Sequence, residues 1–305
     1  MITNMEHTMI NGITFEKLFG ITEEVKVRIV TTNVCNLNCN HCDVGCDLPI
    51  KISSEHVLRT KNFTAKTSEI ELFCEAFKGY GEGNIHTLQG GEVTLLPPKQ
   101  LAEMFELLTR SGRRIGMKTT GYNITEIPLS SLNQLEYIVL AEHGINKEVI
   151  DMCLEYLKVN YKGEVILESI HEHRNTKSII RHGNGTAEQG LACNHFLSTL
   201  TYKHPVIYPC CNTWAIMHNL NDITLKEKFI DAGWTVDNPN LIETLRNWKE
   251  TLPQQFLETI CADSCYMTAN KKDYPVYEIE SHSNDKLLKE SKYTRNLIAH
   301  KIVTQ

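Results

Sequence analysis

Strand-like and helix-like segments alternate along the chain from residue 25 to residue 170. Short runs rich in β-branched and apolar residues predict strands over Val25–Thr31, Asn84–Leu88, Arg114–Thr119, Glu136–Ala141 and Val165–Ile170. Apolar residues three and four positions apart predict helices over Thr67–Lys78, Pro98–Leu108 and Lys147–Val159. This alternation predicts an α/β fold with a parallel sheet and right-handed crossovers. Ligand sites are then expected where the strands end.

Three cysteines, Cys35, Cys39 and Cys42, lie within eight residues directly after the first predicted strand. Three thiolates can hold three irons of a four-iron, four-sulfur cluster, and the fourth iron stays open if no other side chain binds it. Structural zinc is the alternative, because thiolates at gaps of two to four residues also suit tetrahedral zinc. In that case His41 or Cys46 would supply the fourth ligand.

A second motif, Gly90-Gly91-Glu92, ends the second predicted strand. Adjacent glycines at a strand end allow positive φ and let the backbone approach a ligand closely. Glu92 adds a carboxylate beside that backbone. A pair of glycines alone is more often a tight turn, but its position at the strand that follows the cysteine triplet favours a ligand site.

Together, the C-x3-C-x2-C triplet and the Gly-Gly-Glu element resemble the signature of radical S-adenosylmethionine enzymes. The resemblance implies that the triplet binds a 4Fe-4S cluster whose open iron is chelated by S-adenosyl-L-methionine. It implies that Gly90, Gly91 and Glu92 hold the amino group of that cofactor, which is cleaved to a 5′-deoxyadenosyl radical. It also narrows the expected sheet to an open, partial (β/α)6 TIM-like barrel over residues 25–183, after an N-terminal extension over residues 1–24.

Polar residues end two further predicted strands. Thr119 and Thr120 follow the third, where the family often has a small polar turn that contacts the cofactor. Glu168 lies near the end of the fifth, an edge that in the family commonly touches the ribose or the substrate. The alternatives are a simple turn for the threonines and a surface carboxylate for Glu168. Cys46 is a weak catalytic candidate, as a hydrogen-atom donor near the open iron, and is equally well explained as a small buried residue. Cys74 and Cys153 fall in predicted helices and are expected in the core.

Five more cysteines follow residue 184: Cys193, Cys210, Cys211, Cys261 and Cys265. The strand-rich stretch Leu197–Tyr208, with a turn at His204-Pro205, resembles the hairpin of the auxiliary-cluster domains called SPASM and twitch. The resemblance implies a second 4Fe-4S cluster held by these cysteines in a small β-hairpin and helical domain over residues 184–275. It leaves open whether Cys210 or Cys211 binds, because Pro205 stands where the family has a glycine. A zinc ribbon would use the same ligands.

Composition excludes several classes of protein. No apolar run approaches the roughly 20 residues that span a membrane, and a net charge of −6 gives no broad basic surface for nucleic acid. The odd count of 11 cysteines fits metal sites in a reducing cytoplasm better than a disulfide framework. Residues 276–305 are expected to form a solvated C-terminal tail.

The family resemblance implies an enzyme of the oxidoreductase or isomerase type that abstracts hydrogen from a C–H bond. A peptide that is epimerised or crosslinked is the expected substrate, with an external electron donor such as flavodoxin or ferredoxin. The 24 residues before the first strand are too few for a leader-peptide-binding domain, which weighs against a peptide. The alternatives are a small molecule such as a sugar or aminocyclitol and, in another class, a non-catalytic iron–sulfur or zinc binding module.

Overall fold

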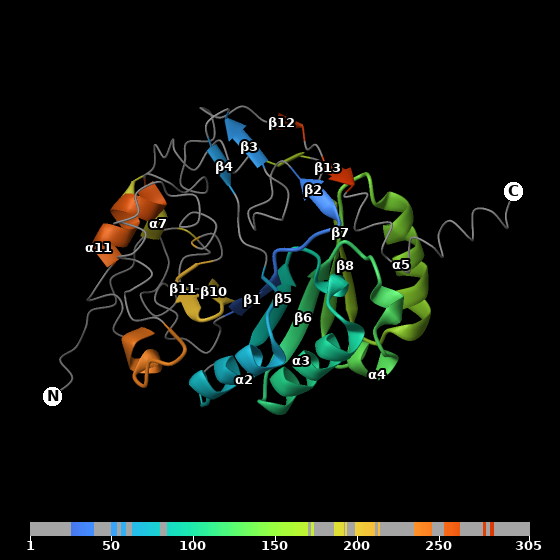
Figure 1. Ribbon diagram of the computed structural model, residues 1–305, viewed down its shortest axis with the longest axis horizontal. Coiled ribbons are helices and arrows are strands. Elements are labelled where there is room, and N and C mark those ends of the chain that lie inside the picture. Colours follow the sequence, from blue (N-terminus) through green and yellow to red (C-terminus); the bar gives the residue numbers. More distant parts are fainter. Residues whose placement is uncertain are drawn as a thin grey trace, which may run out of the picture.

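The structure is a computed structural model. It describes residues 26–39, 50–53, 56–58, 63–79, 84–169, 172–173, 186–191, 193, 199–210, 213, 235–245, 253–262, 277–278 and 281–283. Its main element is a seven-stranded sheet with the order β11-β10-β1-β5-β6-β7-β8 (Figure 1). The strands are β1 (Lys26–Thr32), β5 (Ile85–Gly90), β6 (Arg114–Thr119), β7 (Tyr137–Glu142), β8 (Glu164–Ser169), β10 (Thr199–Lys203) and β11 (Val206–Tyr208). Neighbouring strands run parallel, except β10 and β11. The predicted α/β class and its parallel strands are confirmed.

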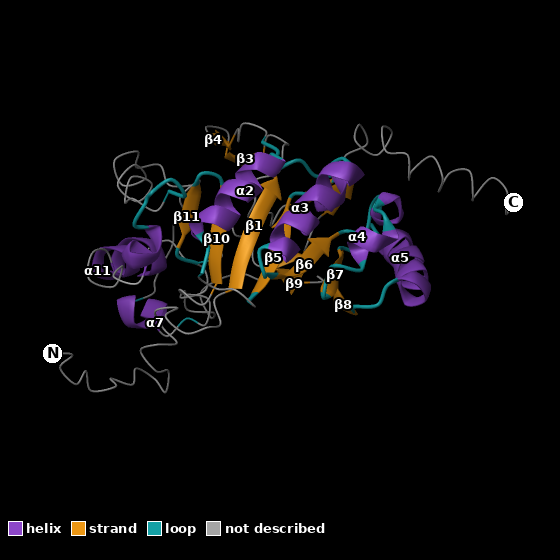
Figure 2. Cartoon of the chain, turned by 90° about the horizontal axis from the view of Figure 1, so that it is seen from below, coloured by secondary structure: helices purple, strands orange, loops and turns teal. Residues whose placement is uncertain are grey.

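Helices alternate with the strands, and α2 and α3 lie across β1, β5 and β6 (Figure 2). The α-helices are α2 (Thr67–Ala76), α3 (Pro98–Arg110), α4 (Leu129–Leu132), α5 (Lys147–Asn160), α7 (Ala187–Leu191) and α11 (Pro253–Phe256). Two 3-10 helices, η1 (Val93–Leu95) and η2 (Ile124–Glu126), and one π-helix, η3 (Leu257–Ala262), complete the set among the described residues. Pro98 starts α3, where its missing N–H costs nothing. Gly112, with φ +79°, follows the end of α3 in the left-handed conformation that terminates helices.

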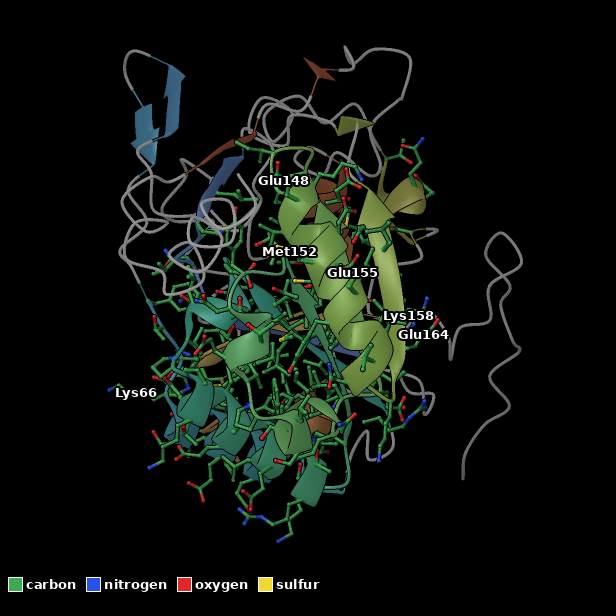
Figure 3. All side chains as sticks on the ribbon, turned by 90° about the vertical axis from the view of Figure 1, so that its right-hand side faces the viewer. Lys66, Glu148, Met152, Glu155, Lys158 and Glu164 are labelled. Atoms are coloured by element: carbon green, nitrogen blue, oxygen red, sulfur yellow. The ribbon has the colours of Figure 1, made fainter. Side chains whose placement is uncertain are left out.

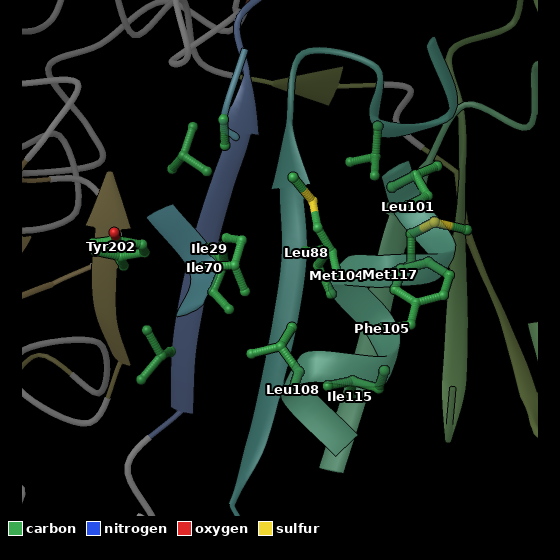
Figure 4. Close-up of a cluster of buried hydrophobic side chains, with 14 of the residues drawn as sticks. Ile29, Ile70, Leu88, Leu101, Met104, Phe105, Leu108, Ile115, Met117 and Tyr202 are labelled. Atoms are coloured by element: carbon green, nitrogen blue, oxygen red, sulfur yellow. The ribbon is translucent and has the colours of Figure 1, made fainter. Parts of the chain in front are cut away.

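The sheet has two unlike faces. On the first, which we call the helix-packed face, Ile29, Leu88, Ile115 and Met117 are buried against α2 and α3 (Figure 4). The helices contribute Ile70, Leu101, Met104, Phe105 and Leu108 to this core. Because side chains alternate along a strand, their neighbours point the other way. We call that second side the half-exposed face; its partly or well exposed side chains are Arg28, Thr87, Gln89, Lys118, Tyr137, Val139, Ile166 and Glu168.

Helix α5 shows a similar division (Figure 3). Its buried side chains are Val149, Ile150, Cys153 and Leu157, and its exposed ones include Glu148, Met152, Glu155 and Lys158. The predicted core positions of Cys74 and Cys153 are confirmed, since these side chains are 8% and 0% exposed.

The hairpin of β10 and β11 belongs to the main sheet. β10 pairs with β1 from Lys26↔Thr199 to Ile29↔Tyr202, and the turn into β11 contains the cis peptide His204-Pro205. The predicted hairpin and its turn are confirmed, and the two strands extend the main sheet beyond β1. The sixth parallel strand thus lies beside β1. The domain boundary at residue 184 and the partial barrel remain predictions.

Three two-stranded sheets complete the described strands: β2 (Leu37–Cys39) with β13 (Ser281–Ser283), β3 (Ile50–Ser53) with β4 (His56–Leu58), and β9 (Glu172–His173) with β12 (Tyr277–Glu278). Within the predicted C-terminal tail, the backbone of residues 277–278 and 281–283 pairs with earlier segments. Within the residues described, no helix is long and apolar enough to cross a membrane.

Candidate functional site

The segment that leaves β1 leads directly to the first cysteine. Its backbone is fixed on one side by residues 63–65: Ala65 N–H donates to Thr31 O at 2.6 Å, and Phe63 N–H donates to Asn33 Oδ1 at 2.8 Å. Cys35 follows and is 8% exposed, with the Leu37 N–H donating to its Sγ at 3.4 Å. A strand end held by these hydrogen bonds therefore places this thiol.

The other cysteines of the triplet are only partly described. Cys39 lies in β2, where it pairs with Ser281 of β13. Cys42, together with the candidates His41 and Cys46, lies outside the described residues. The structure thus shows where the triplet begins and that the chain beyond residue 280 reaches it.

Gly90 and Gly91 lie against the backbone that enters the cysteine loop. A Cβ at Gly90 would overlap Thr32 O, and a Cβ at Gly91 would overlap Val34 O. The same contact carries two hydrogen bonds, from Gly91 N–H to Thr32 O at 2.6 Å and from Glu92 N–H to Val34 O at 2.8 Å. The sequence predicts that these glycines let the backbone approach a ligand. In the structure, the close approach that requires glycine is to residues 32–34.

Glu92 is fully buried, and its carboxylate is surrounded by donors. Thr94 donates from N at 3.0 Å and from Oγ1 at 2.7 Å, and Thr120 N donates at 2.7 Å. The hydroxyls of Thr119 and Thr120 also donate to it. The structure therefore brings together the predicted candidates Glu92, Thr119 and Thr120 at the ends of β5 and β6. Whether they bind a cofactor remains a prediction.

Two residues of this arrangement, Thr94 and Asn36, were not among the sequence candidates. Thr94 stands two residues after Glu92, a spacing that lets the carboxylate cap η1, and this cap could have been recognised. Asn36 is 1% exposed and its Oδ1 lies 3.3 Å from Thr120 Oγ1. Its contact joins residues that are 84 positions apart, so no local pattern predicts it.

Glu168 lies on the half-exposed face, where Lys118 Nζ is 2.6 Å from its Oε2. The pair bridges from β6 to β8 across β7. At the start of β7 on the same face, the Tyr137 hydroxyl forms a hydrogen bond with Thr87. The Tyr137 ring covers Gly116, so any Cβ at position 116 would overlap the ring. Burial raises the pKa of Tyr137 above its ordinary value. The face thus offers the charged groups of Lys118 and Glu168 near the C-terminal ends of β6 and β8, and the hydroxyl of Tyr137 farther from those ends.

The second set of cysteines is described at three positions. Gly190 in α7 lies against Cys261 of η3, and the Cys193 N–H donates to Gly190 O at 3.1 Å, so Cys193 and Cys261 belong to one neighbourhood. Cys210 ends the hairpin, where its O accepts from Thr201 Oγ1 at 3.0 Å and its Sγ lies 2.8 Å from Thr213 Oγ1.

Cys211 and Cys265 lie outside the described residues. Within the described part of the chain, no three His, Cys, Asp or Glu side chains gather as they would around a metal ion. The predicted second metal site therefore stays a prediction.

Residues 29–179 match a family model described as the Radical SAM superfamily. A search of curated proteins finds no match. Among solved structures, "Native anSMEcpe with bound AdoMet" is 17% identical over 47% of this chain and 43% of that chain, with a TM-score of 0.35. "Crystal structure of Streptococcus suis SuiB bound to S-adenosylmethionine" is 14% identical over 80% of this chain and 71% of that chain, with a TM-score of 0.38.

The chain spans about two fifths of the length of the first of these structures, 43%.

Proposed function

We propose that this chain is a radical S-adenosylmethionine enzyme that abstracts hydrogen from a C–H bond of its substrate. Support comes from the family match over residues 29–179 and from one structural observation. The backbone entering the cysteine loop and the Gly90-Gly91-Glu92 element are hydrogen-bonded to each other at neighbouring strand ends. This contact supports the proposal that the two motifs, found separately in the sequence, form one site.

The residues present fit the proposed cofactors. Cys35 offers a buried sulfur that already receives an N–H donor, as thiolates bound to iron commonly do. Glu92 offers a buried carboxylate that suits an ammonium group. In this proposal Cys35, Cys39 and Cys42 hold a 4Fe-4S cluster, and Glu92, supported by Thr119 and Thr120, holds the amino group of S-adenosylmethionine. When bound, the cluster and cofactor supply a carbon-centred oxidant strong enough to remove an unactivated hydrogen.

Because the donors around Glu92 are already numerous, a bound ammonium must share or replace one of them. A carboxylate has about four lone-pair positions, and Thr94, Thr119 and Thr120 direct two N–H and three O–H groups at it. The hydroxyl of Thr94 has a second acceptor in Tyr122 O. We expect this hydroxyl to turn away from Glu92 when the cofactor binds.

We propose that the substrate lies on the half-exposed face and that Lys118 and Glu168 contact it. A peptide that is epimerised or crosslinked is the leading substrate, on the resemblance of the hairpin to SPASM and twitch domains. A small polar molecule is the second candidate. We further propose an auxiliary 4Fe-4S cluster held by the cysteines after residue 184, and flavodoxin or ferredoxin as the electron donor in a reducing cytoplasm.

Anaerobic reconstitution with iron and sulfide, followed by dithionite and S-adenosylmethionine, tests the proposal. We expect about eight irons per chain, from two cubes of about four irons each, and formation of 5′-deoxyadenosine. Replacing Cys35, Cys39 and Cys42 by Ala should leave about four irons and abolish 5′-deoxyadenosine. Iron binding without any 5′-deoxyadenosine in the wild-type chain would indicate a non-catalytic module. Stoichiometric zinc would refute the auxiliary cluster.

A further inference from the structure

Asn36, between Cys35 and Leu37, has an amide whose hydrogen bonds are not satisfied as its atoms stand. Its Oδ1 lies 3.3 Å from Thr120 Oγ1 and 3.8 Å from Cys35 Sγ. Its Nδ2 is buried beside the Tyr122 hydroxyl, but it makes no hydrogen bond of ordinary distance and angle with a described residue. A buried donor without a partner costs about 1–3 kcal/mol, so this orientation of the carboxamide is unfavourable.

The hydroxyl of Thr120 has the opposite problem. It carries one hydrogen but lies within reach of two acceptors, Glu92 Oε2 and Asn36 Oδ1. The carboxylate is the stronger acceptor because it is charged. The hydroxyl hydrogen of Thr120 therefore points toward Glu92, and the lone pairs of Thr120 Oγ1 face Asn36. Two oxygens would then face each other with no hydrogen between them.

Half a turn of the Asn36 carboxamide resolves both conflicts. The turn exchanges Oδ1 and Nδ2 without moving other atoms, and only the hydrogen bonds decide between the two orientations. The turned amide donates one hydrogen to Thr120 Oγ1 and the other to Cys35 Sγ. Its oxygen takes the place of Nδ2 beside Tyr122, whose hydroxyl can donate to it.

We propose that Asn36 is a positioning residue that donates to the sulfur of Cys35 and to Thr120, and so connects an iron ligand to Glu92. Along this connection, Asn36 donates to Cys35 at one end, while at the other it donates to Thr120, which donates to Glu92. All of these side chains are at least nine-tenths buried. The triplet and the Gly-Gly-Glu element are thus linked through side chains as well as through the backbone.

This inference rests on the proposed function, because it gives the amide a sulfur that would bind iron. With Asn36, that sulfur would receive two N–H donors, since the Leu37 N–H already donates to it. Hydrogen bonds to the sulfurs of a cluster help set its reduction potential. Each one draws charge from the sulfur and stabilises the more negative, reduced state. Asn36 is therefore expected to raise the midpoint potential.

The test is an EPR-monitored redox titration of the reconstituted protein, reading the cluster signal that S-adenosylmethionine perturbs. In Asn36→Ala the midpoint should fall by up to about 59 mV, a tenfold change for a one-electron couple. Thr120→Val should lower it less, because the amide loses only the acceptor that orients it. Thr120→Ser should restore the wild-type value, because serine keeps the hydroxyl.

Asn133→Ala is the matched control. Asn133 also makes hydrogen bonds to distant backbone, to Asn160 O at 3.5 Å and from Lys162 N at 2.9 Å, but away from the cysteine loop. The Asn133→Ala variant should have the wild-type midpoint potential. An unchanged midpoint in Asn36→Ala would overturn the inference. If that variant holds no cluster, an unchanged midpoint in Thr120→Val would overturn it instead. A wild-type chain without any signal that responds to S-adenosylmethionine would refute the proposed function itself.

Discussion

The two faces of the main sheet are built from the same strands but differ in the burial and the polarity of their side chains. On β5, His86 and Leu88 point to the helices and are 1% and 0% exposed, whereas Thr87 and Gln89 point the other way and are partly exposed. The first face is closed by apolar contacts with α2 and α3. The second carries charged and hydroxyl groups. The difference indicates that one face provides stability and leaves the other free to carry chemistry.

The largest expected effect tests this division with neighbouring residues. Leu88→Ala should lower the free energy of unfolding by about 2–5 kcal/mol, because it leaves a cavity in a closed core. Gln89→Ala should change it by less than about 0.5 kcal/mol. Urea denaturation of both variants checks the contrast. Equal losses of stability would show that the half-exposed face is also core.

Gly116 is the position where the half-exposed face should behave like core. A Cβ there would overlap the Tyr137 ring, so Gly116→Ala should cost about 1–3 kcal/mol by overpacking. Removing the ring should relieve the clash, so the double variant with Tyr137→Ala should be more stable than the two single losses added together predict. Denaturation of the two single variants and the double variant measures this coupling; additive losses would contradict it.

His86 should make the helix-packed face sensitive to acid. Burial, with a smaller contribution from nearby Arg113, lowers the pKa of His86 to about 3 from 6.5. Between these values only the unfolded chain binds the proton, so stability falls as the pH drops below 6.5, by about 1.4 kcal/mol for each pH unit. Above 6.5 the residue has no such effect. Thermal unfolding of His86→Leu should lose this part of the acid dependence, and an unchanged pH profile would contradict the burial argument.

The smallest effect on stability is expected for the Lys118–Glu168 pair. Its side chains are 35% and 46% exposed, and such pairs contribute at most about 1 kcal/mol. Lys118→Met and Glu168→Gln should therefore fold normally and cleave S-adenosylmethionine without substrate, but turn the substrate over more slowly. Arg114→Met, which breaks the exposed pair with Glu136 at the other end of β6, is the control. If both test variants turned the substrate over at the wild-type rate, Lys118 and Glu168 would not be part of the substrate site.

The sequence could predict the five parallel strands and their helices because each has a strong local signal. The apolar spacing of α3 and its Pro98 start are examples. The approach of Thr119 and Thr120 to Glu92 was partly predictable, because parallel strands end at one edge of a sheet. The position of β10 beside β1 was not, because strand order depends on contacts between distant residues. The same holds for Asn36, whose partners are far away in the chain.

The pairing of β1 with β10 has a consequence for synthesis of the protein. Residue 26 cannot find its partner, residue 199, until nearly the whole intervening chain has left the ribosome. At about 5–20 residues per second, this wait is on the order of ten seconds. Throughout it, β1 has an unpaired edge next to the first cysteines, and such edges are prone to pair with other chains. Translation that stalls between β1 and β10 should therefore yield aggregates linked through β1.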